Sequence, residues 1–185
     1  MEKYGKRDFS MTLTRIMKVL LVVAVIFCMA LPALPVEARE ISEYSVTKDG
    51  AFFKLSEYAE GEERELYSSE TLSELFECDA LKSGAEVILR GIAVTESVTL
   101  KNKSLILRGS VEFSGAELII DGGNVTLSSF SAEFSGDCGI RLKNGELNIE
   151  SSSVRSHKSP AVRLDYSSSA TLVTRESELY SESFM

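Results

Sequence analysis

A strand-like motif recurs every 20 to 25 residues through the second half of the chain. Apolar and polar residues alternate in a first series, "VTLKN" at 98, "LIIDG" at 118, "IRLKN" at 140 and "VRLDY" at 162. A second series is "LIL" at 105, "VTL" at 125, "LNI" at 147 and "ATL" at 170, and a third is "VEF" at 111, "AEF" at 132, "VRS" at 154 and "LYS" at 179. Three short strands, each with one buried face, therefore recur once per repeat of about 22 residues.

A repeat of this length leaves no room for a helix between neighbouring parallel strands. The compact solution is an all-β parallel β-helix, in which each strand pairs with its equivalent one turn of the solenoid away; we call one such turn a rung. Three to four rungs of about 22 residues are predicted. An antiparallel sandwich also shows short strands with regular turns, but its strands do not usually repeat in a three-strand register with matching turn residues.

The alternation also predicts which side chains point into the core. They are Val98, Leu100, Leu118, Ile120, Ile140, Leu142, Val162 and Leu164 in the first series; Leu105, Leu107, Val125, Leu127, Leu147, Ile149 and Leu172 in the second; and Val111, Phe113, Ala132, Phe134, Val154 and Leu179 in the third. The segments between strands, such as "DGGN" at 121 and "SSS" at 151, contain the residues that turns favour.

The start of the chain predicts export. Residues 1–38 combine a basic beginning, an apolar run from Val19 to Leu31, and small residues at Val36 and Ala38, which is the pattern of a signal peptide. The run is shorter than the ~20 residues that span a bilayer, so a membrane anchor is the weaker alternative. We expect cleavage after Ala38, a secreted or cell-surface location, and no membrane attachment after cleavage.

Three segments are expected after the signal peptide. Residues 39–69 form an acidic N-terminal segment that can hold a hairpin through "KDG" at 48, followed by a solvated stretch, "EYAEGEERE". Residues 70–84 are predicted to form a capping helix, because Thr71 and Glu74 make a capping box and Gly84 is a helix stop. Residues 85–185 form the β-helix, which lacks a cap at its end. Either this open end stacks on a partner, including a second copy, or the β-helix continues in a longer protein.

The net charge limits the classes of binding partner, and the cysteine content limits the possible disulfides. Residues 39–185 hold 15 of the 20 Lys and Arg and 25 of the 28 Asp and Glu, a net charge of −10. A chain this acidic is poorly suited to nucleic acid or to anionic membranes. Cys78 and Cys138 remain after cleavage, and export permits a disulfide between them without requiring it.

The helix and the repeats, from "GAEVILRGIAVTESVTLKNKSLILRG" to "GIRLKNGELNIESSSVRS", resemble the right-handed parallel β-helix proteins of the pectate-lyase-like superfamily. The similarity is greatest to secreted or surface-displayed bacterial members and covers residues 70–183. It implies a right-handed solenoid. It does not imply one activity, because that fold includes lyases, hydrolases, adhesins and passive stalks.

In enzymes of that superfamily the outward side of the first series often forms the sugar groove. The outward pairs here are Thr99 and Lys101, Ile119 and Asp121, Arg141 and Lys143, and Arg163 and Asp165. The second members alternate in sign. We favour a charge ladder between rungs, about 4.8 Å apart, over an acid–base or calcium site. Asp121 and Asp165 lie two rungs apart and could not readily share one calcium ion.

No catalytic, cofactor-binding or metal-binding residue is predicted. Of the motifs of the superfamily's hydrolases only Arg141 and Lys143, as Arg-x-Lys, are matched, and no two aspartates are adjacent. The sole histidine, His157, is expected to be a solvated turn residue. We therefore expect a non-enzymatic surface, adhesion or glycan-contacting module. The alternatives are the N-terminal part of a carbohydrate-active enzyme whose catalytic rungs are missing, and a structural unit that stacks end to end.

Overall fold

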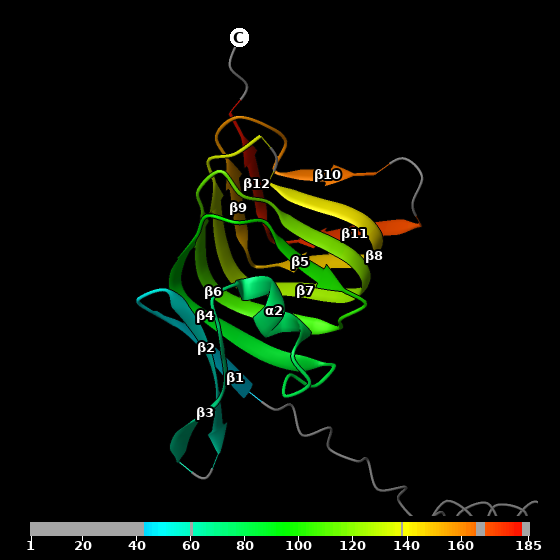
Figure 1. The fold of residues 1–185 in the computed structure, drawn as a ribbon. Coiled ribbons are helices and arrows are strands. Elements are labelled where there is room, and N and C mark those ends of the chain that lie inside the picture. Colours follow the sequence, from blue (N-terminus) through cyan, green and yellow to red (C-terminus); the bar gives the residue numbers. More distant parts are fainter. Residues whose placement is uncertain (1–42, 60, 138, 166–168, 183–185) are drawn as a thin grey trace, which may run out of the picture. The chain divides into compact units, whose positions relative to one another are not determined.

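The computed structural model describes residues 43–59, 61–137, 139–165 and 169–182 (Figure 1). The chain divides into two compact units, 1–40 and 41–185, and the described residues belong to the second. The expected signal peptide, residues 1–38, lies outside the described residues. Within them, twelve strands join into one sheet and a single short helix is present.

The fold is a β-solenoid of about four turns with a spacing of about 22 residues, as the repeat predicted. Its strands are β4 (Ala85–Val94), β5 (Val98–Lys101), β6 (Leu105–Phe113), β7 (Leu118–Phe134), β8 (Ile140–Glu150), β9 (Ser153–Ser156), β10 (Val162–Leu164), β11 (Ala170–Arg175) and β12 (Glu178–Ser181). All their pairings are parallel, and each joins one rung to the next.

Three faces run along the solenoid and correspond to the three series of the sequence. The first face contains β5, the beginnings of β7 and β8, and β10. The second contains the beginnings of β4 and β6, the middle of β7, the end of β8, and β11. The third contains the ends of β4, β6 and β7, then β9 and β12. Ile120 lies opposite Leu142, for example, in the predicted 22-residue register.

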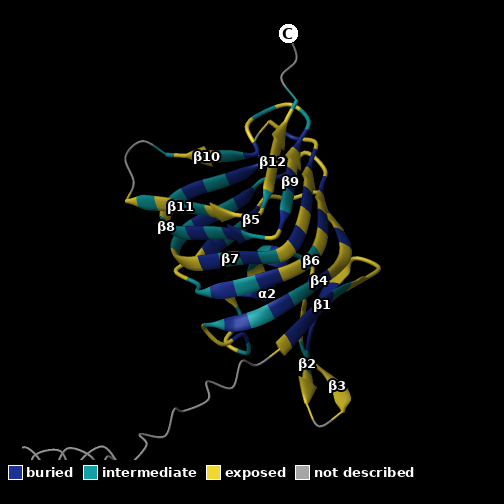
Figure 2. Ribbon diagram, turned by 180° about the vertical axis from the view of Figure 1, so that it is seen from behind, coloured by how far each residue is buried: buried dark blue, intermediate teal, exposed yellow. Residues whose placement is uncertain are grey.

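The core of the central rungs contains the predicted inward side chains. Leu100, Ile120 and Leu142 are completely buried on the first face. On the third face, the rings of Phe113 and Phe134 stack with centroids 4.4 Å apart and planes 9° apart. Figure 2 shows the resulting alternation of buried and exposed residues along β6, β7 and β8.

The rungs approach closely at their corners. Gly109 has φ +93°, and a Cβ placed there would overlap the carbonyl oxygen of Leu89 on the preceding rung. Only glycine combines this backbone conformation with so close an approach. The corner therefore fixes the spacing between β4 and β6.

The N-terminal end is closed by three strands. β1 (Glu43–Asp49) pairs parallel with β4 and antiparallel with β2 (Phe52–Ala59), which gives the hairpin that the sequence allowed. β3 (Glu62–Ser69) pairs with β2. The stretch that we expected to be only solvated is thus part of the sheet, although most of its side chains are exposed as its acidic composition indicates.

The expected capping helix is shorter than residues 70–84. Helix α2 runs over Leu72–Glu77, and the Thr71 side chain accepts a hydrogen bond from the Glu74 amide at 3.3 Å. Ser69 supplies the reciprocal half of the capping box. Its hydroxyl oxygen accepts a hydrogen bond from the Thr71 amide, and its O–H donates a hydrogen bond to the Glu74 carboxylate. The helix ends at Cys78, which is extended, because the following turn brings Leu81 into the core.

The C-terminal end differs from the prediction. Leu164 and Leu179 were expected inside but are 44 % and 42 % exposed, and Leu172 is only half-buried. Their rung, β10 to β12, pairs with β8 and β9 on one side, and no other described strand covers its second edge. A side chain that points inward is therefore fully buried only where a further rung covers it.

Candidate functional site: the outer surface of the first face

A bidentate ion pair joins the last two rungs on the first face. The Arg141 Nε atom lies 3.2 and 3.1 Å from the two carboxylate oxygens of Asp165, and its Nη2 atom lies 3.1 Å from one of them. Hydrogen bonding and charge from Arg141 lower the pKa of the Asp165 carboxyl, against a raising effect of desolvation. The more distant cations Arg163 and Lys143 lower this pKa further.

A second pair lies one rung earlier. The Lys143 Nζ atom is 3.8 Å from Asp121, and the Asn144 side-chain amide donates to the other Asp121 oxygen at 2.9 Å. A register shift after Ile120 places Asp121 opposite Asn144, so two side chains of the next rung reach one carboxylate.

The predicted column of alternating charges is confirmed at the contact of Lys143 with Asp121. The bidentate partner of Asp165 is Arg141, with Lys143 acting on it through its charge, and Lys101 pairs with Glu77 of helix α2 at 3.5 Å. The length of the basic side chains explains these partners. Arginine and lysine side chains are long enough to choose a partner beside the register position, and the helix brings a carboxylate that no repeat contains.

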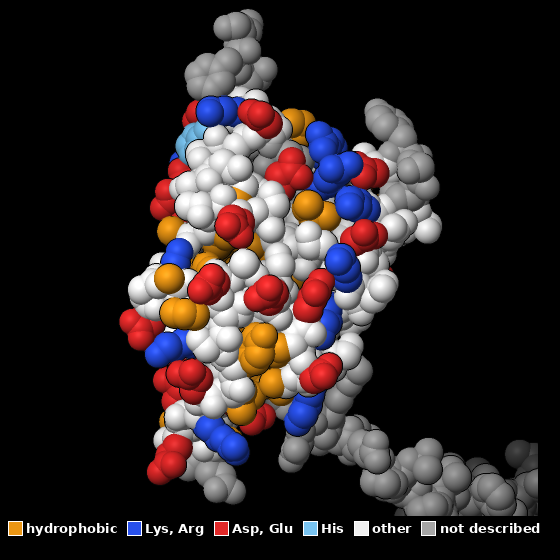
Figure 3. All heavy atoms as spheres, viewed as in Figure 1, with side chains coloured by type: hydrophobic (Ala, Val, Ile, Leu, Met, Phe, Trp, Pro, Cys, Tyr) orange, Lys and Arg blue, Asp and Glu red, His pale blue; other side chains and the backbone are white. Residues whose placement is uncertain are grey.

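The arrangement favours a structural role for these charges. Asp121 and Asp165 are each paired with a cation of an adjacent rung. Within the described ranges, no group of three His, Cys, Asp or Glu side chains could hold a metal ion. Figure 3 shows basic and acidic side chains interspersed over the visible surface, as such pairing requires. The disulfide that export would permit joins Cys78 to Cys138. Cys78 is half-buried at the end of α2, and Cys138 lies outside the described residues.

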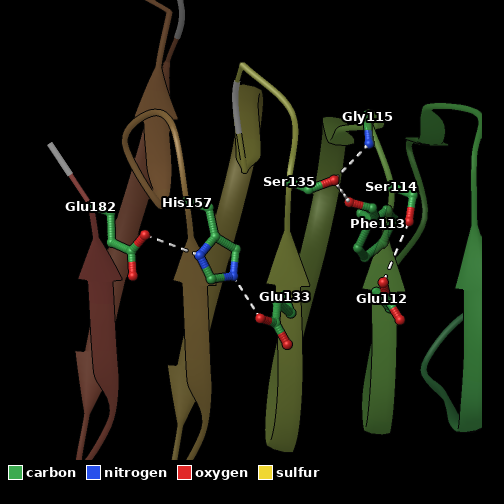
Figure 4. Close-up of polar contacts among 8 residues, drawn as sticks. All are labelled: Glu112, Phe113, Ser114, Gly115, Glu133, Ser135, His157 and Glu182. Carbon is green, nitrogen blue, oxygen red and sulfur yellow. Dashed lines mark hydrogen bonds and ion pairs between the residues drawn. The ribbon is translucent and has the colours of Figure 1, made fainter. Parts of the chain in front are cut away.

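Sequence reasoning missed the partners of His157. The residue lies in a bend after β9, as expected, but it is not simply solvated. Its Nε2 atom lies 2.5 Å from Glu133 of β7, and its Nδ1 atom lies 3.2 Å from Glu182, which follows β12 (Figure 4). The two glutamates stand one repeat before and one repeat after it in the sequence. This spacing of about one repeat was the feature of the sequence that could have identified the two glutamates as partners of His157.

A serine ladder at the corner between the second and third faces was also missed. The buried Ser152 hydroxyl lies within donating distance of two carbonyls, that of Glu150 at 2.7 Å and that of Leu127 at 3.1 Å, and it accepts from the Phe130 amide at 3.0 Å. One rung later, Ser177 repeats the last two of these contacts with the Ile149 carbonyl and the Ser152 amide, at 3.0 and 3.2 Å. A hydroxyl side chain suits these positions because it can donate and accept at once.

The surface beside this ladder is hollowed. Ser129, Ser151 and Glu176 occupy the equivalent corner of three rungs, each with φ close to +50°. Two shallow hollows lie along the corner and share Ser131. One of them also contains Glu112 and Glu133, and the other is lined by Ser129, Phe130, Ser151, Ser152, Ser153, Glu176 and Glu178. Hydroxyl and carboxylate groups therefore face solvent along several rungs.

No protein family, curated protein or solved structure matches the chain. Among the residues that the structure describes, no helix combines the length and apolar character needed to cross a membrane.

Proposed function

We propose that the chain is an exported, non-enzymatic β-solenoid of the pectate-lyase-like type, which contacts glycans at a cell surface. The observation that carries the proposal is that the outward charged side chains of the first face are paired with one another between rungs. Arg141 with Asp165, and Lys143 with Asp121, bind adjacent rungs to one another. Such paired groups hold the strands in register and are poorly placed to transfer protons to a sugar.

The serine-lined corner supports contact with a glycan. Its exposed side chains, Ser129, Ser131 and Ser151, offer hydroxyl groups, and Glu176 and Glu178 offer acceptors. This chemistry suits the hydroxyls of a neutral polysaccharide better than a polyanion, which the glutamates would repel. Equivalent corners repeat from rung to rung, so a long chain molecule could contact several of them.

Binding without cleavage is the test. The protein would be applied to immobilised neutral and acidic polysaccharides, and release of reducing ends would be followed in parallel. We expect retention on a neutral glycan and no released product. Ser131→Arg should weaken retention, and Ser68→Arg, the same substitution at an exposed serine of β3 outside the corner, serves as the matched control. Cleavage of any polysaccharide would instead support the carbohydrate-active enzyme.

Export is tested separately. Expression of the full chain in a bacterial host with a secretion pathway should deliver a product that begins at Arg39, as N-terminal sequencing would show. A cell-retained product with an intact N-terminus would contradict export and leave the glycan assay unaffected.

A structural unit that stacks end to end is the second candidate, and one observation favours it. Leu164 and Leu179 expose apolar surface at the uncovered edge of the last rung. Light scattering after size exclusion would give the mass of the full chain and of residues 39–185 over a range of concentrations. Stacking predicts a mass that grows with concentration, whereas a constant monomer mass would exclude it.

A further inference from the structure

His157 lies between carboxylates of the rung before it and the rung after it. Its two ring nitrogens meet Glu133 at 2.5 Å and Glu182 at 3.2 Å, and Figure 4 shows the ring between the two side chains. The imidazole is about one-third exposed. The three residues belong to three successive rungs, through β7, β9 and the segment after β12.

This geometry favours a proton on each ring nitrogen. A neutral imidazole carries one N–H, so it can donate to only one of the two carboxylates. The other ring nitrogen would then present its lone pair to carboxylate oxygens, which repel it. The imidazolium ion donates to both glutamates at once, and each bond is then charge-assisted.

The two carboxylates act in the same direction on the pKa of the ring. Hydrogen bonding to Glu133 and then to Glu182 raises the pKa of His157 above its ordinary value of 6.5, while desolvation opposes the rise. The neighbouring cations on its own segment are Lys158 and Arg155, and the Arg155 guanidinium lies 5.3 Å from the Tyr180 ring centre on β12. Two anions from packed elements therefore face the one histidine of the chain.

The last rung is where such a contact matters. Its inward leucines, Leu164 and Leu179, remain more than two-fifths exposed, so apolar burial fastens it less firmly than the central rungs. Backbone hydrogen bonds from His157 to Phe134 and from Glu182 to Ser156 align the three rungs beside the ring. The histidine then adds a side-chain connection that spans all three.

We propose that His157 is a proton-dependent clasp that fastens the last rung of the solenoid when protonated and loosens it when neutral. The site binds a proton, and its two carboxylates come from the rungs that the clasp joins. The inference does not depend on the proposed function.

The direction of the pH effect follows from linkage. Because the pKa is raised on folding, the stabilisation is fully present below the unfolded value of about 6.5 and is lost as the pH rises through the folded value. An alkaline shift therefore loosens β12, while β6, which takes no part in this contact, keeps its protection.

The test uses the full chain, in which the single histidine gives one resolvable imidazole signal. An NMR titration should place its midpoint above 6.5, and Glu133→Gln and Glu182→Gln should each lower the midpoint. Amide exchange, corrected for the intrinsic effect of pH, should show β12 losing protection from about pH 5.5 to 8.5, with β6 unchanged.

Two variants complete the experiment. His157→Gln should remove the pH dependence of β12 protection, and Lys158→Gln removes a neighbouring positive charge without touching the clasp, so it should keep that dependence. A histidine midpoint at or below 6.5 would overturn the proposal, and so would β12 protection that does not change with pH. The titration of the unmodified chain decides the matter even if a variant fails to fold.

Discussion

The two ends of the solenoid are built differently. At the N-terminal end, helix α2 docks on β5 through Ser73, whose hydroxyl donates to the Ser97 carbonyl and accepts from the Thr99 amide. The helix residues Leu72 and Phe76 are buried. At the C-terminal end, the last rung leaves Leu164 and Leu179 more than two-fifths exposed. Among the described residues, apolar packing closes the N-terminal end, and the rung of β10 to β12 has no such cover.

Polar contacts also attach the last described rung, where apolar burial is incomplete. On the first face the last rung is attached by Arg141 and Asp165, and on the second by Arg175 and Glu150 at 4.0 Å. On the third face it is attached by His157 and Glu182, and by Arg155 over the Tyr180 ring. Each such contact is individually modest, since exposed ion pairs contribute little. Cross-rung side chains join the central rungs too, so the difference is that the central rungs add a buried core and the last described rung has little of it.

The largest expected effect comes from placing a charge in the central core. Leu142 is completely buried and lies between Ile120 of one rung and Leu164 of the other. Leu142→Asp should cost on the order of 5 kcal/mol or more, enough to unfold the protein, because the carboxylate would have no partner. Circular dichroism of the purified variant would show the loss of the β signal.

The same substitution at the open end is the matched control. Leu164→Asp places the carboxylate where solvent reaches it, so the cost should be about 1 kcal/mol or less. Thermal melts of the two variants compare the ends directly. Equal tolerance of both substitutions would contradict the register in which Leu142 and Leu164 are paired.

A smaller contrast is expected from truncation on the third face. Phe134 is fully buried and stacks on Phe113, so Phe134→Ala should cost about 3–5 kcal/mol. Leu179→Ala on the last rung should cost about 1 kcal/mol, since much of that side chain is already in water. Urea unfolding of both variants measures the difference. Similar losses would mean that the last rung is packed as firmly as the centre.

The sequence was sufficient for the repeat and insufficient for the side-chain partners. The 22-residue spacing places Ile120 opposite Leu142 because period-two alternation and a rung of constant length leave little choice of register. The partners of Lys101 and Asp165 could not be read in this way, since long side chains reach past the register position. The helix ends at Cys78 and not at Gly84 because burial of Leu81 overrides the local stop signal.

The pH dependence of stability tests how much the ion pair of Arg141 and Asp165 contributes at the last described rung. Arg141 lowers the pKa of Asp165 on folding, so the carboxylate adds stability above its ordinary value of 3.8 and loses that effect as the pH falls through the lowered value. Asp165→Asn should therefore lower Tm slightly at neutral pH, and the difference from the unmodified protein should close at acid pH. Melting curves from pH 7 to pH 3 measure this, and a difference that widens toward acid would contradict the assigned pair.

The smallest effect is expected from Lys143→Ala. The side chain is about one-third exposed and its ion pair with Asp121 is 3.8 Å long, so the loss should stay below ~1 kcal/mol. Asp121 would keep the hydrogen bond from Asn144, which further limits the cost. Urea unfolding of Lys143→Ala, Asn144→Ala and the double variant would separate the two partners. A loss above ~2 kcal/mol for Lys143→Ala alone would mean that the ion pair, and not the buried leucines, sets the register of the central rungs.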